Sequence, residues 1–263
     1  EPEMLKSYTV DGKLMSIPIA RNMCGIVVNK TLLEKEGLDI PQTYPEFINA
    51  CKILKEKGYT PIQASKIHAS SDLVLPMAMC MIANDSSLLS KINASDPSAA
   101  DSLTEVYEKL NDLYAEGYMD ASLNAEYPDD NYDGAILKFF EGDVPFWVCT
   151  TECVSGMKKR ESKSEAFSAN PFEYTFINAP LSDDGAYVYE EPWYGFAVNR
   201  ESDNIDYAVE FMQFLMTEDE LNTIASVKGM PSAAKNSTDE RYKDALDPEK
   251  TAATYIYDGN MKT

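Results

Sequence analysis

The sequence has a single histidine, His68, among 263 residues, and this scarcity removes most catalytic centres. A Ser-His-Asp triad would have to use that one residue, and no Gly-x-Ser-x-Gly turn is present to expose a serine nucleophile. A metal centre built from several histidines is excluded for the same reason. The Gly-x-Gly-x-x-Gly fingerprint and the phosphate-binding P-loop are both missing. We therefore expect no cofactor and no metal.

Cysteine is also scarce, and its spacing is irregular. The five cysteines are odd in number and lack a Cys-x-x-Cys pair, so neither a disulfide framework nor a structural zinc site is indicated. Cys149 and Cys153 are four residues apart and could meet. Because unpaired cysteines behave as small buried apolar residues, we expect buried free thiols.

Basic residues are in the minority, with 23 lysines and arginines against 44 acidic residues and a formal net charge of −21. The only tight basic cluster is residues 158–160, so no basic stripe is present to neutralise phosphates, and we expect no nucleic-acid partner. The acidic excess is typical of a solvated surface. No apolar run approaches the roughly 20 residues that span a bilayer.

Short apolar runs alternate with amphipathic stretches, and this pattern predicts an α/β fold. The expected strands are residues 26–29, 61–64, 144–149, 174–179 and 193–199. The expected helices are residues 44–57, 73–83, 101–116, 132–141, 205–216 and 218–227. Residues 13–20 are apolar in part, but Pro18 favours an edge or connecting segment there. The tail after Pro231 reads as short helices.

One stretch carries the first hint of a site. Residues 144–149 form a nearly continuous apolar run, typical of a strand buried on both faces. Thr150, Thr151 and Glu152 follow, and either threonine can begin a helix as its cap. Ligands of open α/β sheets bind beyond the carboxyl ends of strands, so these residues are predicted to face a ligand.

Several motifs together resemble one family. They are residues 11–20 (Asp-Gly-Lys…Pro), 27–33, 37–47 (Gly-Leu…Pro-x-Thr-Tyr-x-Glu-Phe), 140–142 before a strand, and 208–215 with Gly229–Pro231. Their types and order resemble the extracellular solute-binding proteins of ABC importers. The resemblance is closest to the carbohydrate-binding branch that is similar to maltodextrin-binding protein. It covers nearly the whole chain.

The resemblance implies a two-lobe architecture of the periplasmic-binding-protein type II kind, with a ligand cleft between two α/β lobes. It divides the chain into the end of the first lobe and a crossing (1–21), the second lobe (22–198), helices of the first lobe (199–229) and a helical return to the second lobe (230–263). It also implies that the chain is truncated at both ends, so that most of the first lobe is missing.

The function that the resemblance implies is delivery of a solute, a mono- or oligosaccharide, to the permease subunits of an ABC importer. Such a protein acts outside the cell or in the periplasm, held to the membrane by a lipid anchor in its full-length form. It works as a monomer and has no catalytic activity.

Candidate ligand residues follow from matching positions in the family. Asn22 and its neighbour Arg21 follow the proline strand, and the expected loop 65–72 with His68 and Asp72 faces the cleft. Thr151 and Glu152 fall where maltodextrin binders carry an aromatic ring that stacks on sugar. Because this chain departs from the family there, Trp193 and Tyr194 are expected to supply the aromatic platform.

Two other classes of function remain open. The first is a binding protein for a peptide, a polyamine or an amino-sugar acid, in which Glu152, Glu190, Glu191 and Asp72 hold a cation and Arg21 holds a carboxylate. The second is a glycosidase with a carboxylate pair, either Glu190 and Glu191 or Asp129 and Asp130. Adjacent strand residues point to opposite faces, so neither pair forms a natural acid/base dyad.

Overall fold

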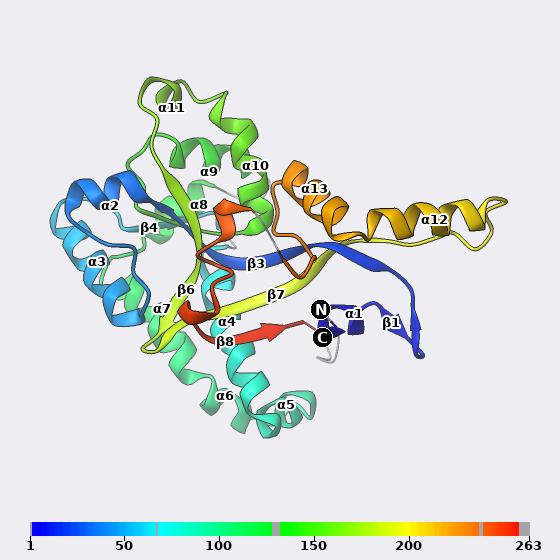
Figure 1. Ribbon diagram of the computed structural model, residues 1–263. Helices are drawn as coiled ribbons and strands as arrows, with labels where there is room; N and C mark the ends of the chain where they lie inside the picture. Colours follow the sequence, from blue (N-terminus) through cyan, green and yellow to red (C-terminus); the bar gives the residue numbers. More distant parts are fainter. Residues whose placement is uncertain (1, 67, 128–131, 237–238, 258–263) are drawn as a thin grey trace.

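A computed structural model describes residues 2–66, 68–127, 132–236 and 239–257. Its framework is a six-stranded mixed sheet in the order β4-β5-β3-β6-β7-β8 (Figure 1). These strands are β4 (Ile62–Ala64), β5 (Phe146–Thr150), β3 (Ile17–Asn29), β6 (Tyr174–Ser182), β7 (Gly185–Phe196) and β8 (Thr251–Ile256). The β4–β5 and β7–β8 pairs are parallel, and the other pairs are antiparallel. The predicted α/β fold is confirmed.

Strand β3 is the longest strand and changes neighbours along its length. Residues 24–29 lie between β5 and β6, whereas residues 17–23 pair with β7. The sequence predicted a connecting segment followed by a short strand, and that division was wrong. Pro18 is tolerated because it pairs with Gly195 near the end of the strand, where β3 is no longer enclosed by β5 and β6.

Strands β6 and β7 form the hairpin that Asp184-Gly185 predicted. The separate strand expected at 193–199 is instead the end of β7. Near the end of β7, Tyr194 has a φ of 48°, which is rare outside glycine. The next residue, Gly195, has no room for a side chain because an added Cβ would lie 2.0 Å from Ser16 Oγ. β7 therefore approaches the chain before β3 closely at this point.

Helices cover both faces of the sheet. One face, with Ile26 and Val148, packs against α3 (Tyr44–Glu56), α4 (His68–Asn84) and α7 (Thr104–Ala115). The other face, with Val27 and Trp147, packs against α9 (Tyr132–Phe139), α10 (Thr151–Glu161) and the 3-10 helix η2 (Glu240–Tyr242). The remaining helices of this main body are α2 (Lys30–Glu36), α5 (Ser86–Asn93), α6 (Ser98–Ser102), α8 (Ala121–Glu126) and α11 (Glu165–Ala169).

A smaller part extends from the main body, reached by the far ends of β3 and β7 (Figure 1). It contains α1 (Pro2–Lys6), β1 (Thr9–Val10), β2 (Lys13–Leu14), α12 (Ile205–Leu215) and α13 (Glu218–Lys228). On α12, Tyr207, Phe211 and Phe214 are all more than half exposed. The residues around Ile19 and Met230 form a small separate core beneath α13.

The tail differs from the predicted run of short helices. Two 3-10 helices, η2 and η3 (Pro248–Lys250), are present, but β8 follows them and pairs in parallel with β7. Residues 251–254 alternate between half-buried and exposed, as expected of an edge strand, and Tyr255 and Ile256 are both half-buried. The five cysteines are buried free thiols, as predicted. No single helix within the described ranges is both long enough and apolar enough to cross a membrane.

Candidate functional site

The topology of the sheet points to one crevice. β4 and β5 are parallel neighbours, and each leads into a helix at its carboxyl end. The helix after β4, α4, packs on one face of the sheet, and the helix after β5, α10, packs on the other. Ligands of open α/β sheets bind at the carboxyl edge of the strands where helices diverge in this way, and we call this edge the crevice.

His68 and Asp72 lie at the start of α4 and not in a loop, because the helix begins at His68. One helical turn separates them, so the imidazole Nδ1 lies 2.6 Å from Asp72 Oδ2. The Asp72 carboxylate also accepts a hydrogen bond from Ser71 Oγ, at 3.1 Å, and the Cys24 thiol lies 3.9 Å from it. Burial first, and then the charges of Asp72 and Glu191, raise the pKa of the Cys24 thiol.

Asn22 and Glu191 form the second group at the crevice. β3 runs antiparallel to β5 with Cys24 opposite Thr150, so Asn22 lies just beyond the carboxyl end of β5. The Asn22 amide donates to Glu191 Oε1 at 2.8 Å, and the Tyr189 hydroxyl donates to Glu191 Oε2 at 3.2 Å. Burial and then the Glu191 charge raise the pKa of the Tyr189 hydroxyl.

Sequence reasoning missed the aromatic residue beside this group. The ring of Tyr255, on β8, stacks on Tyr189 with centroids 5.9 Å apart and an angle of 18° between the rings. It escaped notice because the tail was expected to be helical. The β-branched and aromatic residues Thr254, Tyr255 and Ile256 were the signal that could have revealed a strand, and with it a tyrosine beside β7.

Thr151 and Glu152 begin α10, as predicted, but they have different surroundings. Thr151 is fully buried; its hydroxyl accepts from the Met23 N–H at 3.1 Å and lies 3.2 Å from the Arg21 carbonyl. Asn22 Oδ1 lies 3.3 Å from the same hydroxyl. The hydroxyl therefore joins α10 to β3, whereas the exposed Glu152 lies at the rim of the crevice. Thr150 is the N-cap residue of α10, although its hydroxyl makes no capping hydrogen bond.

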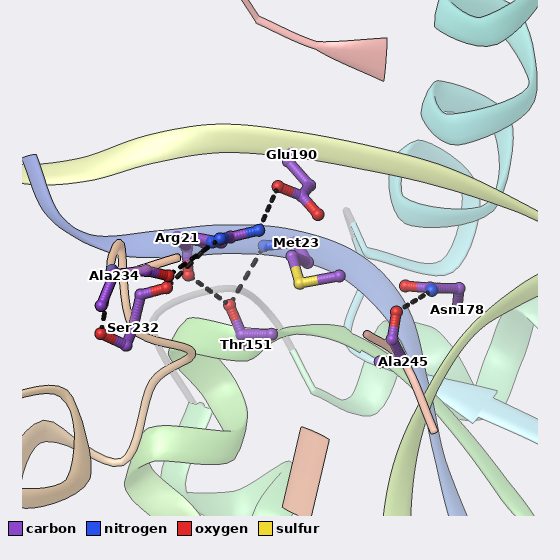
Figure 2. A network of polar contacts seen from close by, with 8 residues as sticks. All are labelled: Arg21, Met23, Thr151, Asn178, Glu190, Ser232, Ala234 and Ala245. Atoms are coloured by element: carbon purple, nitrogen blue, oxygen red, sulfur yellow. Dashed lines mark hydrogen bonds and ion pairs between the residues drawn. The ribbon is translucent and has the colours of Figure 1, made fainter. Parts of the chain in front are cut away.

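Arg21 lies on the opposite face of the sheet from Asn22. Its guanidinium pairs with Glu190 and donates to the backbone carbonyls of Ser232 and Ala234 (Figure 2). Adjacent strand residues alternate between faces, and this alternation also separates Glu190 from Glu191. The structure therefore does not bring Arg21 to the crevice with the other predicted residues.

Trp193 and Tyr194 lie further along β7 than Glu191, in the part of the strand that pairs with residues 17–20 of β3. Trp193 packs against the small core under α13, and its buried indole Nε1 has no hydrogen-bond partner within the described part of the chain. Tyr194 is 48% exposed, with the Lys228 amine 5.2 Å from its ring centroid. A ligand role for either residue stays a prediction.

The crevice offers groups suited to a polar, uncharged ligand. Two carboxylates, an amide and an imidazole lie around it, and the buried Ser65 Oγ just before α4 has no partner among the described residues. These are the donors and acceptors that bind hydroxyl groups. No group of three His, Cys, Asp or Glu side chains within the described ranges is placed to hold a metal ion.

Comparison with solved structures places the fold among solute-binding proteins. The chain is similar to RafE of Streptococcus pneumoniae in complex with raffinose (TM-score 0.72, 18% identity, 97% of this chain and 66% of that one). It is also similar to a sugar transporter of Bacillus licheniformis in complex with stachyose (TM-score 0.66, 19% identity, 100% and 68%). The chain spans about two thirds of the length of these structures. The predicted two-lobe class of fold is thereby confirmed.

Two sequence comparisons agree with the fold. The Multiple sugar-binding protein of Streptococcus mutans serotype c is 39% identical over 54 residues, which is 20% of this chain and 13% of that protein. The sequence profile described as "Bacterial extracellular solute-binding protein" matches residues 1–253. Because that match covers nearly the whole chain, this protein belongs to the bacterial extracellular solute-binding protein family.

Proposed function

We propose that this protein binds a mono- or oligosaccharide in the crevice between the starts of α4 and α10 and delivers it to an ABC importer. The observation that carries the proposal is the Glu191 carboxylate, held by hydrogen bonds from Asn22 and Tyr189. Structures of the same fold in complex with raffinose and stachyose support a sugar as the solute.

The chemistry of the crevice suits a sugar. Hydroxyl groups both donate and accept, so they are bound well by carboxylates that accept and amides that do both. Tyr255, which is partly buried and stacks on the buried Tyr189, is the aromatic ring that we propose for the C–H face of a sugar. Polar groups around an aromatic surface are the usual composition of a small-molecule site.

The setting of the protein is part of the same proposal. The family is extracellular, and one protein of similar fold is a probable secreted solute-binding lipoprotein of Streptomyces coelicolor (TM-score 0.70, 16% identity, 98% of this chain and 65% of that one). We infer a lipid anchor, permease subunits as partners, and a monomeric state.

Binding without catalysis is proposed on geometry. Glu190 and Glu191 lie on opposite faces of β7, each with a partner of its own, so they do not face one substrate. The other suggested pair, Asp129 and Asp130, lies outside the described residues. A glycosidase mechanism has no support in this arrangement.

The acidic character of the crevice favours a second candidate, a cationic solute such as a polyamine. Asp72, Glu152 and Glu191 lie in or at the rim of the crevice, whereas Arg21 is neutralised by Glu190 on the other face. A peptide or amino-sugar acid would need a cation for its carboxylate. Arg21 was the expected cation, and its partners lie elsewhere.

Calorimetric titration of the purified protein with raffinose, stachyose and spermidine tests the proposal. We expect a sugar to bind, and Asn22→Ala to weaken binding at least tenfold, about 1.4 kcal/mol. Asn170→Ala, at the exposed end of α11, serves as the matched control and should not alter affinity. Binding of spermidine with no response to either sugar would favour the cationic solute instead.

A further inference from the structure

Three stretches of chain connect the main body to the smaller part. Two of them are β3 and β7, whose residues 20–23 and 190–193 lie opposite one another. The third is residues 229–234, which leave α13 and return to the main body. It joins β3 through the Arg21 N–H, which donates to Pro231 O at 2.9 Å, and through a bridge between Ala20 and Ser232.

One side chain contacts all three connections. The Arg21 guanidinium, on β3, lies 3.2 Å from Glu190 Oε2 on β7. Its Nε donates to Ser232 O at 2.9 Å, and its second terminal nitrogen donates to Ala234 O at 3.2 Å (Figure 2). The planar fork of arginine can hold several acceptors at fixed angles, which a lysine ammonium cannot do.

The contacts of the Arg21 guanidinium are buried, and a turn in the third connection provides two of its acceptors. The side chains of Arg21 and Glu190 are each 7% exposed. Ser232 Oγ accepts a hydrogen bond from the Ala234 N–H at 3.1 Å, which forms a short turn. The carbonyl groups of both residues in this turn accept from the guanidinium. The cost of removing both charges from water offsets much of the attraction in a buried ion pair, so the pair is not by itself a sign of added stability.

Arg21 and Glu190 are also linked to the positions of the crevice residues on the other face of the sheet. Arg21 and Glu190 each precede a crevice residue in sequence, Asn22 and Glu191, and those neighbours pair across the same two strands. The Thr151 hydroxyl bonds the β3 backbone at Met23 and lies 3.2 Å from the Arg21 carbonyl (Figure 2). A change in register or tilt between β3 and β7 would therefore move the crevice residues relative to α10.

We propose that Arg21 and Glu190 are positioning residues that hold the three connections as one unit. By doing so they fix Asn22 and Glu191 relative to the start of α10. The guanidinium acts from the face of the sheet opposite to Asn22 and Glu191. The effect on solute binding rests on the proposed function, whereas the holding of the connections does not.

Hydrogen exchange of the solute-free protein, followed by mass spectrometry, tests the holding of the connections. The double variant Arg21→Met/Glu190→Met removes both buried charges together, so no unpaired charge is left. We expect exchange in residues 232–234 to become at least tenfold faster, with residues 26–28 of β3 unchanged. Unchanged protection of residues 232–234 would overturn the proposal.

Two further variants keep the test sound. Arg21→Lys keeps the charge beside Glu190 but lacks the planar fork, so it should also speed exchange in residues 232–234. It replaces the double variant in the test if the double variant fails to fold. Arg160→Met removes an arginine that contacts Gly156 O and Asp133, away from the three connections, and should leave residues 232–234 protected. Equal loosening by Arg160→Met would show a general loss of stability and overturn the assignment.

Titration with raffinose tests the link to the crevice. The double variant should bind raffinose at least tenfold more weakly than the wild type, and Arg160→Met should bind it equally. Loosened connections with wild-type affinity for raffinose would contradict the positioning of Asn22 and Glu191. A wild-type protein that binds no sugar contradicts the proposed function alone, since the exchange experiment uses no solute.

Discussion

At the scale of a single residue, Gly25 determines how closely β3 and β6 approach. It lies in the middle of the sheet, opposite Cys149 on one side and Asn178 on the other. A Cβ added there would lie 2.3 Å from Ile177 O and 2.6 Å from the Phe176 ring, and the first of these atoms is backbone. We expect Gly25→Ala to lower the free energy of unfolding by about 3 kcal/mol, measured by urea denaturation.

Gly156, on α10, is the matched control for this prediction. A methyl group added there meets the flexible end of Arg160 and the side chain of Ile136. Because alanine is a better helix former than glycine, Gly156→Ala should change stability by less than about 1 kcal/mol. If Gly25→Ala proved as stable as Gly156→Ala, the close approach of β3 and β6 would be wrong.

At the scale of elements, sequence patterns predicted most helices and the buried strands. Periodicity located the helices that became α3, α4, α9, α12 and α13, and the apolar run before Thr150 located β5. The predictions were wrong where pairing between distant strands overrode a local sequence rule. Pro18 divided β3 in the prediction because the sequence does not show which edge of a strand is paired, and β8 was missed because its pairing with β7 is distant in sequence.

The candidate site was predicted in part, for a related reason. Thr151 follows β5 directly, so a rule about strand ends located it, whereas His68 and Asp72 were expected from the segment that follows β4 in the family. The face on which a strand residue points depends on its register with its neighbours, which the sequence does not give. Arg21 was therefore grouped with Asn22, although the two side chains lie on opposite faces.

The docking of α10 onto β3 depends on the Thr151 hydroxyl. Thr151→Val keeps the shape of the side chain but leaves the buried Met23 N–H without its acceptor. An unsatisfied buried N–H costs about 1–3 kcal/mol, so we expect a loss of stability in that range, measured by urea denaturation. Thr151→Ser retains the hydroxyl and should lose less. Equal losses for valine and serine would assign the effect to packing alone.

At the scale of the whole molecule, charge is the dominant feature. The net charge of −21 is spread over a protein whose sequence pI is about 4.3. Many of the basic side chains are already engaged, for example Lys57 with Glu36 and Lys138 with Glu141. The remaining carboxylates repel one another, and this repulsion opposes the compact state.

Salt should therefore stabilise the protein near neutral pH. Raising the ionic strength from 0.01 M to 1 M shortens the screening length from about 30 Å to about 3 Å. We expect the melting temperature at pH 7 to rise by roughly 3 °C or more, equivalent to about 1 kcal/mol for a chain of this size, measured by scanning calorimetry in sodium chloride. Near pH 4.3 the net charge is close to zero, so the increase should largely disappear there. The same increase at both pH values would show that salt acts on apolar burial and not on charge repulsion.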